Sequence, residues 1–268
     1  MKWVADSTGH FKYRPHYDAA ELDAECESLV CKFLADKYGV SRFPIATDDL
    51  SVMIERDTSD LDLYADLSSA GDDVEGVTEF FADRKPAVKI AKELSLDTLR
   101  HHRLRTTLAH EYGHVKFHAF LWDTLSARPA KSIWGRLTRQ RNRYERVRAG
   151  FGNSASADRA PVARVVTRTR DLADLSPGPG SICKRALMLD APLSDWMEWQ
   201  ASYVSGAILM PASSLRGLVG SILTPNEGEV VPLDSPAAGE LAARVSETFD
   251  VSQEAARVRL TRLGFLQQ

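Results

Sequence analysis

The sequence predicts an α+β fold in which a small mixed or antiparallel sheet is combined with helices. Residues 19–38 and 99–120 carry apolar side chains at the three- and four-residue spacing of amphipathic helices. Between them, residues 50–94 contain short apolar runs separated by Asp, Gly, Lys and Pro, a pattern typical of strands. Strands and helices that are segregated along the chain are characteristic of α+β proteins.

The expected elements follow one another in a simple order. A polar leader covers residues 1–16 and precedes the helix over residues 19–38, which we expect to cover the sheet. The expected strands, largely antiparallel, occupy residues 52–54, 61–67, 74–81 and 87–90. A further helix begins near Ser194 and stops at Pro211, because proline cannot continue the helical hydrogen-bond pattern.

Two segments show no clear pattern of secondary structure. A long insertion at about residues 123–191 contains Pro129 and the run Ser176-Pro-Gly-Pro-Gly-Ser181, and loops of this length are usually functional, disordered or inserted. A linker rich in Gly and Pro is expected over residues 215–236. It separates a main domain, residues 17–214, from a C-terminal segment over residues 237–268 that resembles a helix-turn-helix.

The composition excludes several classes of protein. With 268 residues, 44% of them hydrophobic and 26% charged, the chain is neither disordered nor collagenous, and it can bury a sizeable core. Cys26, Cys31 and Cys183 form neither a CxxC pair nor an even set, so we expect free thiols in a reducing compartment. The N-terminus lacks an apolar signal-peptide core, and no apolar run approaches the roughly 20 residues that span a bilayer. We therefore expect a cytoplasmic protein with no membrane contact.

The formal charge of −3 conceals a strongly basic segment. Between Arg128 and Arg170 there are twelve basic residues and two acidic ones. Together with Trp134 and Tyr144, this segment could contact phosphates and stack on bases, or attract an acidic partner protein. A solvated loop is the alternative. The candidate contact residues are Arg136, Arg139, Arg141 and Arg143.

The helix expected over residues 99–120 carries an HExxH motif, His110-Glu-Tyr-Gly-His114. Side chains four residues apart lie about 40° apart around a helix, so both imidazoles can bind one metal ion. Glu111 can then act as the general base toward a water on that metal, as in zinc peptidases. Gly113 would let another backbone approach closely. Two histidines that only form hydrogen bonds on a helix are the alternative.

A catalytic zinc ion normally takes a third protein ligand. Phe120 occupies the position at which the extended motif of the metzincin class would place a histidine, so that class is excluded. Two candidates remain: His118, one turn further along the helix, and Glu198 on the downstream helix. Glu198 is favoured because Ser202 and Ser205 on a neighbouring face are small enough to let its helix press against the motif helix. Such a site accepts Zn²⁺ and also Mn²⁺.

Two tyrosines lie close to these ligands in the sequence. Tyr112 and Tyr203 could donate to the oxyanion of a tetrahedral intermediate, a role that zinc peptidases often give to tyrosine. Packing in the core is the alternative for each of them, and for His118 the expected role is packing beside the metal ligands.

The chain resembles the ImmA/IrrE family of metallopeptidases over about residues 17–120 and 183–268. The resemblance lies in residues 105–114, in residues 198–211 and in the terminal residues 241–264. In that family the third ligand is a glutamate thirteen residues before the proline of a Leu-Met-Pro ending, which corresponds to Glu198 here. The resemblance implies a zincin-like, zinc-dependent endopeptidase that cuts a helix-turn-helix repressor and thereby releases mobile-element or stress-response genes. The long segment before Glu198 departs from the shorter members.

Two other functions remain open. In the first, the protein is a DNA-binding transcriptional regulator whose C-terminal helix exposes Arg257, Arg259 and Arg262 to a groove, with a structural or vestigial metal site. The intact Glu111 argues against it, because a structural zinc site needs no base. In the second, the protein is a metal-dependent amidase that acts on a small substrate. We expect the C-terminal segment to pack against the main domain or to recognise the substrate.

Overall fold

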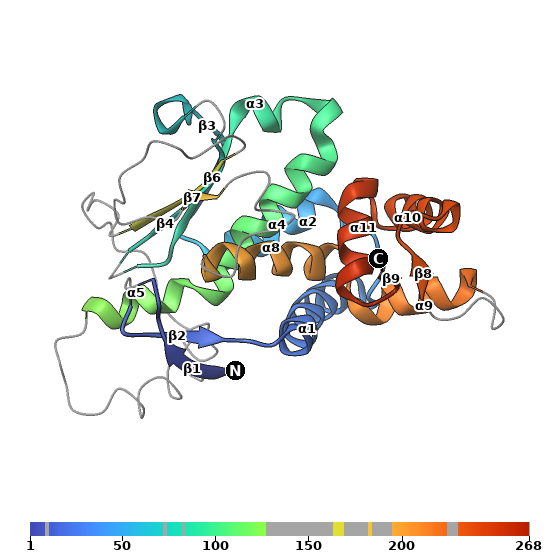
Figure 1. Ribbon diagram of the computed structural model, residues 1–268. Helices are drawn as coiled ribbons and strands as arrows, with labels where there is room; N and C mark the ends of the chain where they lie inside the picture. Colours follow the sequence, from blue (N-terminus) through green and yellow to red (C-terminus); the bar gives the residue numbers. More distant parts are fainter. Residues whose placement is uncertain are drawn as a thin grey trace.

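A computed structural model describes residues 1–8, 11–71, 74–81, 84–126, 163–168, 182–183, 195–223 and 230–267. It is an α+β fold in which a five-stranded mixed sheet packs on a layer of helices, as predicted (Figure 1). No helix within these ranges is both long enough and apolar enough to cross a lipid bilayer.

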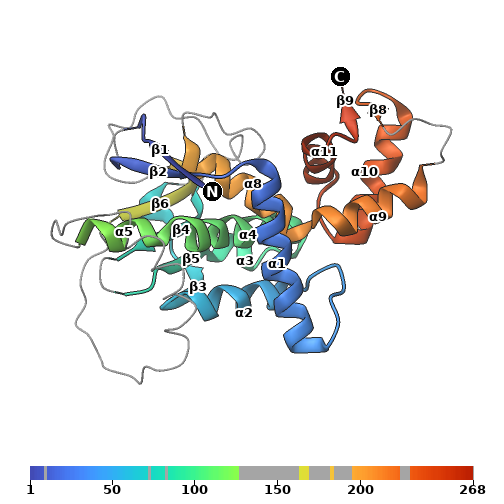
Figure 2. The ribbon, with the colours of Figure 1, turned by 90° about the horizontal axis from the view of Figure 1, so that it is seen from below.

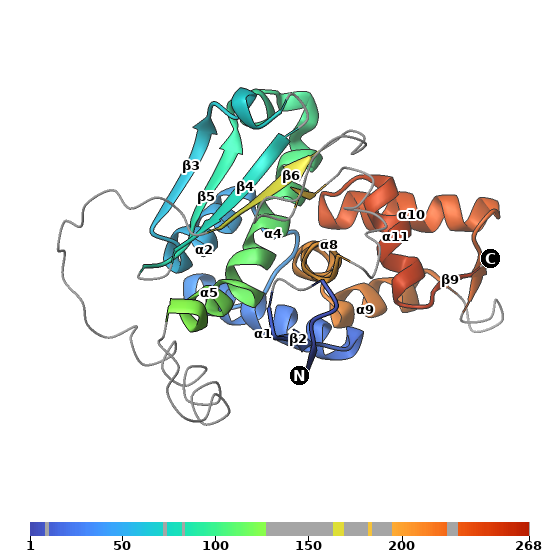
Figure 3. The same cartoon turned by 60° about the vertical axis from the view of Figure 1, so that its left-hand side comes forward.

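The main sheet has the strand order β3-β5-β4-β6-β7. Its strands are β3 (Asp60–Ala65), β5 (Ala87–Ala91), β4 (Val74–Phe80), β6 (Ala163–Arg168) and β7 (Ile182–Cys183). The central strand β4 pairs antiparallel with β5 and β6, whereas β3 pairs parallel with β5, and β6 parallel with β7. The sheet is therefore mixed rather than largely antiparallel. Figure 3 shows β3, β5, β4 and β6 side by side.

The segment expected to be an irregular insertion contributes to this sheet. Strands β6 and β7 both come from residues 123–191, and β6 pairs with β4 from Val74 to Phe80. Its beginning, residues 123–126, completes helix α5 (Ala119–Ser126). The prediction of an irregular segment is therefore wrong at α5, β6 and β7. Strand β6 pairs with β4, which is distant in the sequence, so this pairing leaves no local signal in the residues of β6.

The leader also has secondary structure. Strands β1 (Lys2–Ala5) and β2 (Tyr13–His16) form a separate antiparallel pair. Helix α1 (Ala19–Tyr38) follows and matches the predicted residues 19–38. It begins with a capping box, in which Asp18 and Glu21 satisfy each other's backbone N–H groups.

Residues 52–54, expected to form a strand, belong instead to helix α2 (Thr47–Asp57). Leu50, Met53 and Ile54 are buried on one face, at the spacing of a helix rather than the alternation of a strand. A short apolar run has an ambiguous period, and tertiary packing decides it. Short helices α3 (Lys92–Ser95) and η2 (Thr98–Arg100) then lead into the motif helix, and a second short turn, η1 (Ser68–Ala70), follows β3.

The motif helix α4 (His101–Phe117) lies along one face of the sheet, beside α8 (Trp196–Leu209) (Figures 1 and 3). The two helices approach closely at Gly113, where a Cβ atom would lie 3.1 Å from the Cα atom of Ala201. The prediction that Gly113 permits a close backbone approach is thus confirmed. Helix α1 packs on α8 from the other side.

The C-terminal residues form three helices and a short parallel strand pair. Helices α9 (Ala212–Ile222), α10 (Pro236–Phe249) and α11 (Gln253–Arg262) gather at one end of the molecule, as Figures 1 and 2 both show. Strands β8 (Val231–Pro232) and β9 (Leu266–Gln267) pair beside them. The expected linker over residues 215–236 is therefore helical over its first part, because Leu215 and Val219 are buried on one face of α9.

The two predicted helices at the C-terminus are present, and one of the three arginines considered for DNA contact is buried. Arg259 is 1% exposed, and its guanidinium donates to the carbonyl of Met210 and to Asp23 of α1. Arg262 donates to the carbonyl of Ser202 on α8. The expectation that α11 exposes these arginines to a DNA groove is wrong for Arg259, which helps to anchor α11 on the rest of the fold. One apolar core runs from α1 through α4 and α8 into α10 and α11.

Candidate metal centre

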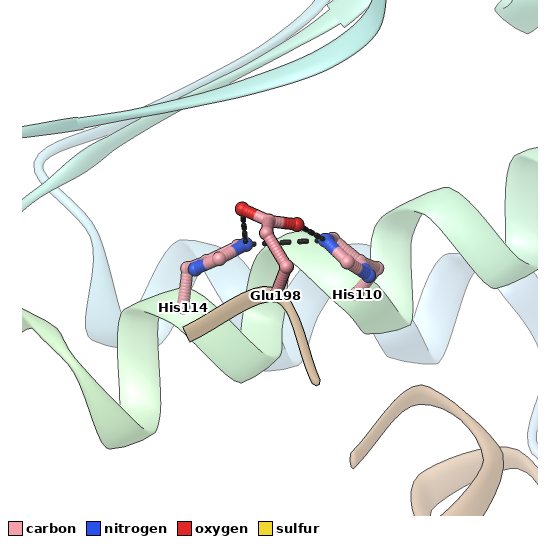
Figure 4. A group of neighbouring side chains, drawn as sticks. All are labelled: His110, His114 and Glu198. Carbon is pink, nitrogen blue, oxygen red and sulfur yellow. Dashed lines mark hydrogen bonds and ion pairs between the residues drawn. The ribbon is translucent and has the colours of Figure 1, made fainter. Parts of the chain in front are cut away.

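Helices α4 and α8 bring three potential ligands to one point (Figure 4). His110 and His114 come from successive turns of α4, and Glu198 comes from the first turn of α8. His110 Nε2 lies 3.1 Å from Glu198 Oε2, and His114 Nε2 lies 3.4 Å from Glu198 Oε1. The structure thus brings together the three residues that the sequence singled out, and their role as ligands stays a prediction.

The chemistry of these donor atoms suits a divalent cation. The two Nε2 atoms are only 3.1 Å apart, and all three side chains are fully buried. Imidazole nitrogens that face each other can share a single proton, and a carboxylate can only accept. Within the described residues, Glu198 Oε1 has no hydrogen-bond partner. Two histidines and a carboxylate that converge in this way fit the coordination preferences of zinc.

The electrostatics of the metal-free site are dominated by burial and by one ion pair. Burial alone would raise the pKa of Glu198, but the His114 and His110 imidazoles outweigh it, so the pKa is held far below its usual range. Burial alone would lower the pKa of His114, but the Glu198 carboxylate outweighs it and raises that pKa. A metal ion that binds at this imidazole must compete with a proton whose binding the Glu198 carboxylate favours.

Asp195, a further carboxyl group close to Glu198 in the sequence, immediately precedes α8. It caps the N-terminus of the helix by accepting from the backbone N–H of Glu198 at 3.4 Å. Burial, and secondly the charge of Glu198, raises the pKa of Asp195 to about 7.

Glu111, the expected general base, is held by strand β4. It is fully buried, and its Oε2 atom accepts a hydrogen bond from the hydroxyl of Thr78 at 2.6 Å. A Cβ atom at Gly76, on the same strand, would lie 2.6 Å from Glu111 Oε1. β4 therefore orients this carboxylate and leaves room for it.

Sequence reasoning did not single out Thr78 or Gly76 for this role. A glycine inside a strand often marks a close approach by another group, and that was the available signal.

A second buried group lies behind His114. His118 Nδ1 is 3.0 Å from His114 Nδ1, and His118 Nε2 is 3.1 Å from Gln200 Oε1. Burial, and secondly the neighbouring His114, hold the pKa of His118 well below its usual range. His118 therefore packs beside the ligands, as expected. The role of Gln200 was not predicted, because no local sequence pattern distinguishes it from the other polar residues of α8.

The two tyrosines are buried in the core with bonded hydroxyls. The hydroxyl of Tyr112 donates to Asp57 at 2.9 Å, and that of Tyr203 donates to Asp23 at 3.0 Å. Both hydroxyls are thus engaged by carboxylates of α2 and α1, a geometry that favours the packing alternative, and their role as oxyanion donors stays a prediction. Arg136, Arg139, Arg141 and Arg143 lie outside the described residues.

The sequence matches no known protein-family model, and no curated protein is detectably similar to it. The resemblance to the ImmA/IrrE family therefore rests on the motifs of this chain and on the site that they form.

Proposed function

We propose that the protein is a zinc-dependent endopeptidase with a zincin-like catalytic domain. The observation that carries the proposal is the convergence of His110, His114 and Glu198 beside Glu111 in one buried site. A metal site that served structure alone would have no use for an oriented carboxylate next to its ligands. A zinc ion bound there lowers the pKa of water toward ~7 and polarises a carbonyl group.

The residues of the chain have distinct tasks in this proposal. His110, His114 and Glu198 hold the metal, and Mn²⁺ is a chemically acceptable substitute for Zn²⁺. Glu111 takes the proton of the attacking water and delivers it to the leaving amine, which typically contributes about 10²–10⁴-fold in rate. Thr78 keeps one oxygen of Glu111 in place, so that the carboxylate need not reorient during the reaction.

The proposed substrate is a helix-turn-helix transcriptional repressor. Its support is the resemblance of residues 105–114 and 198–211 to the ImmA/IrrE family, together with the ligand set that those two stretches provide. The rival reading as a DNA-binding regulator loses support because Arg259 of α11 is buried against α1 and α8. Cleavage would remove the repressor from its promoter.

The decisive experiment measures metal content and cleavage together. The protein is co-expressed with the helix-turn-helix repressor encoded nearest to it, the fragments are identified by mass spectrometry, and bound metal is measured by elemental analysis. Glu111→Gln should retain the metal and lose cleavage, because the amide cannot accept the proton. Glu198→Ala should lose most of the metal.

Two outcomes would overturn these assignments. Undiminished cleavage by Glu111→Gln would overturn the mechanism. Normal metal stoichiometry in Glu198→Ala would overturn Glu198 as a ligand and return His118 to consideration.

A further inference from the structure

A chain of buried hydrogen bonds connects the N-terminal strand β2 to one of the metal ligands. It consists of three links. The amide nitrogen of Gln200 lies 3.2 Å from the carbonyl oxygen of Pro15, its Oε1 atom lies 3.1 Å from His118 Nε2, and His118 Nδ1 lies 3.0 Å from His114 Nδ1. The side chains of Gln200, His118 and His114 are 1%, 0% and 0% exposed, so no bulk water competes for these links.

The donor and the acceptor in each hydrogen bond of this chain follow in turn from the carbonyl of Pro15. A backbone carbonyl can only accept, so Gln200 must turn its NH₂ group toward Pro15. This leaves Oε1, which can only accept, facing His118. The proton of the His118 ring therefore sits on Nε2.

The last link determines the form of His114. A neutral imidazole with its proton on Nε2 presents a lone pair on Nδ1, so His118 accepts from His114. The His118 ring also meets the Trp196 ring edge-on, with 5.3 Å between the ring centroids. A buried, positively charged His118 would find no compensating charge at the Trp196 ring. The His114 ring must then carry its proton on Nδ1. Its Nε2 atom, which faces His110 and Glu198, is left with the lone pair that metal binding needs.

We propose that Gln200 and His118 are positioning residues that set the tautomer of His114, with the carbonyl of Pro15 as the fixed reference. This inference rests on the metal site of the proposed function. His110 differs in this respect, because its Nδ1 atom has no hydrogen-bond partner within the described part of the chain. The β1–β2 pair, which adds nothing to the main sheet, thereby acquires a role in the metal site.

The test compares the affinity for Zn²⁺ in four variants, measured by competition with a chelator of known affinity. Gln200→Met and His118→Phe break the chain of hydrogen bonds and should weaken zinc binding by about 10–100-fold. His118→Asn should bind nearly as well as the wild type, because its Oδ1 atom can accept from His114 where the histidine Nδ1 did. Ser205→Ala is the matched control: it removes a buried hydroxyl of α8 that, among the residues described, bonds only to the carbonyl of Ser202, and it should bind normally.

A second readout reports the tautomer directly. Long-range ¹H–¹⁵N spectra of histidine-labelled, metal-free protein, recorded at a pH where the rings are neutral, distinguish a proton on Nδ1 from one on Nε2. We expect His114 to be protonated on Nδ1 in the wild type, in Ser205→Ala and in His118→Asn. Gln200→Met and His118→Phe should give a mixture. If Gln200→Met does not fold, the comparison of His118→Phe with His118→Asn still tests the proposal.

The outcomes separate this inference from the proposed function. A wild-type protein that binds no zinc would overturn the metal site and the proposed function with it. The tautomer spectra would still test the hydrogen-bond chain, because they are recorded without metal. A wild type that binds zinc, with Gln200→Met and His118→Phe equally tight and unchanged in tautomer, would overturn the positioning role alone. His118→Asn as weak as His118→Phe would show that His118 only fills space.

Discussion

The hydroxyl of Thr78 on β4 lies 2.6 Å from Glu111 Oε2 on α4, and both residues are fully buried. The two residues are 33 positions apart in the sequence, and the hydrogen bond between them joins the sheet to the motif helix. Strand β4 therefore contributes to the candidate site although it supplies no ligand. It fixes the carboxylate to which the proposed mechanism gives a chemical rather than a metal-binding task.

Removing this hydroxyl should reduce activity without affecting metal binding. Thr78→Val replaces the hydroxyl with a methyl group of similar size, and a hydrogen bond to a charged group contributes about 1.5–3 kcal/mol. We expect the rate of peptide cleavage to fall about 10–100-fold, with the zinc content unchanged. Thr78→Ser keeps the hydroxyl and is the control. Equal rates for Thr78→Val and the wild type would show that Glu111 is oriented by other contacts.

Adding a methyl group between α4 and α8 should separate the ligands. In Gly113→Ala, the new Cβ atom would lie 3.1 Å from Ala201 Cα and 3.2 Å from Val204 Cγ1, in a helix contact that has no spare volume. We expect a loss of about 1–3 kcal/mol in the free energy of unfolding, and weaker zinc binding. Urea denaturation and chelator competition measure the two effects.

Gly217→Ala is the matched control for this substitution. Gly217 lies in α9 with nothing within 4 Å of an added Cβ atom, so alanine there should stabilise the helix by up to about 1 kcal/mol. If Gly113→Ala also stabilised the protein, the close packing of α4 on α8 would be wrong.

Removing the metal should lower thermal stability. A ligand that binds only the folded state adds RT ln(1 + [L]/Kd), which is about 2.7 kcal/mol at a hundredfold excess over Kd. We expect a chelator to lower the melting temperature of the wild type and to leave Glu198→Ala almost unchanged. If neither the chelator nor added Zn²⁺ changed the melting temperature of the wild type, the metal site would be contradicted.

Asp250 should make a pH-dependent contribution to stability. It accepts from His101 at 2.9 Å and His102 at 3.1 Å, at the start of α4. Burial alone would raise its pKa, but the hydrogen bond to His101 and the charge of Arg105 outweigh it, so the pKa lies below its usual value. A lowered carboxyl pKa stabilises the fold above the unfolded-state pKa of about 4, and this contribution is lost as the pH falls through the folded-state pKa.

Asp250→Asn isolates that charge, because asparagine tolerates the positive φ of 53° at this position. We expect it to reduce the free energy of unfolding by less than about 1 kcal/mol at pH 7 and by less still at pH 3. Urea denaturation at both pH values measures the difference. If the loss in the free energy of unfolding became larger at low pH, it would contradict this explanation.

Arg259 should be one of the most sensitive residues of the C-terminal helices. Its guanidinium donates to Asp23 at 2.7 Å from a fully buried position. Arg259→Met removes one partner of a buried ion pair, which typically costs about 3–5 kcal/mol. Arg257→Met removes the same charge from a partly exposed side chain that bonds only weakly to the Leu233 carbonyl at 3.3 Å, and it should cost far less. Similar losses for both would contradict the anchoring role of Arg259.

Local patterns in the sequence predicted the elements whose signals lie within one or two helical turns. The spacing of apolar residues predicted α1 and α4. The motif placed His110 and His114 on one helix face. The small residues of the downstream helix favoured Glu198, the resemblance to the ImmA/IrrE family implied the same residue, and the structure brings it to the same point.

Contacts between distant residues were not predictable in the same way. Gln200 and Thr78 gain their roles only when α8 and β4 pack beside α4, and neither role has a local pattern. The hydroxyls of Tyr112 and Tyr203 turned out to bond to carboxylates on other helices. Strand β6 forms by pairing with β4, so its own residues carried too little information to separate it from a loop.

The position of Glu198 in the chain has a consequence for the order of folding. His110 and His114 become neighbours as soon as one turn of α4 forms, whereas Glu198 is 88 positions away from His110 and arrives only when α8 docks. Contacts between residues so far apart form slowly, because the intervening chain must first be closed into a loop. An early, two-ligand site would hold zinc loosely, and tight binding would signal that α8 has docked on α4.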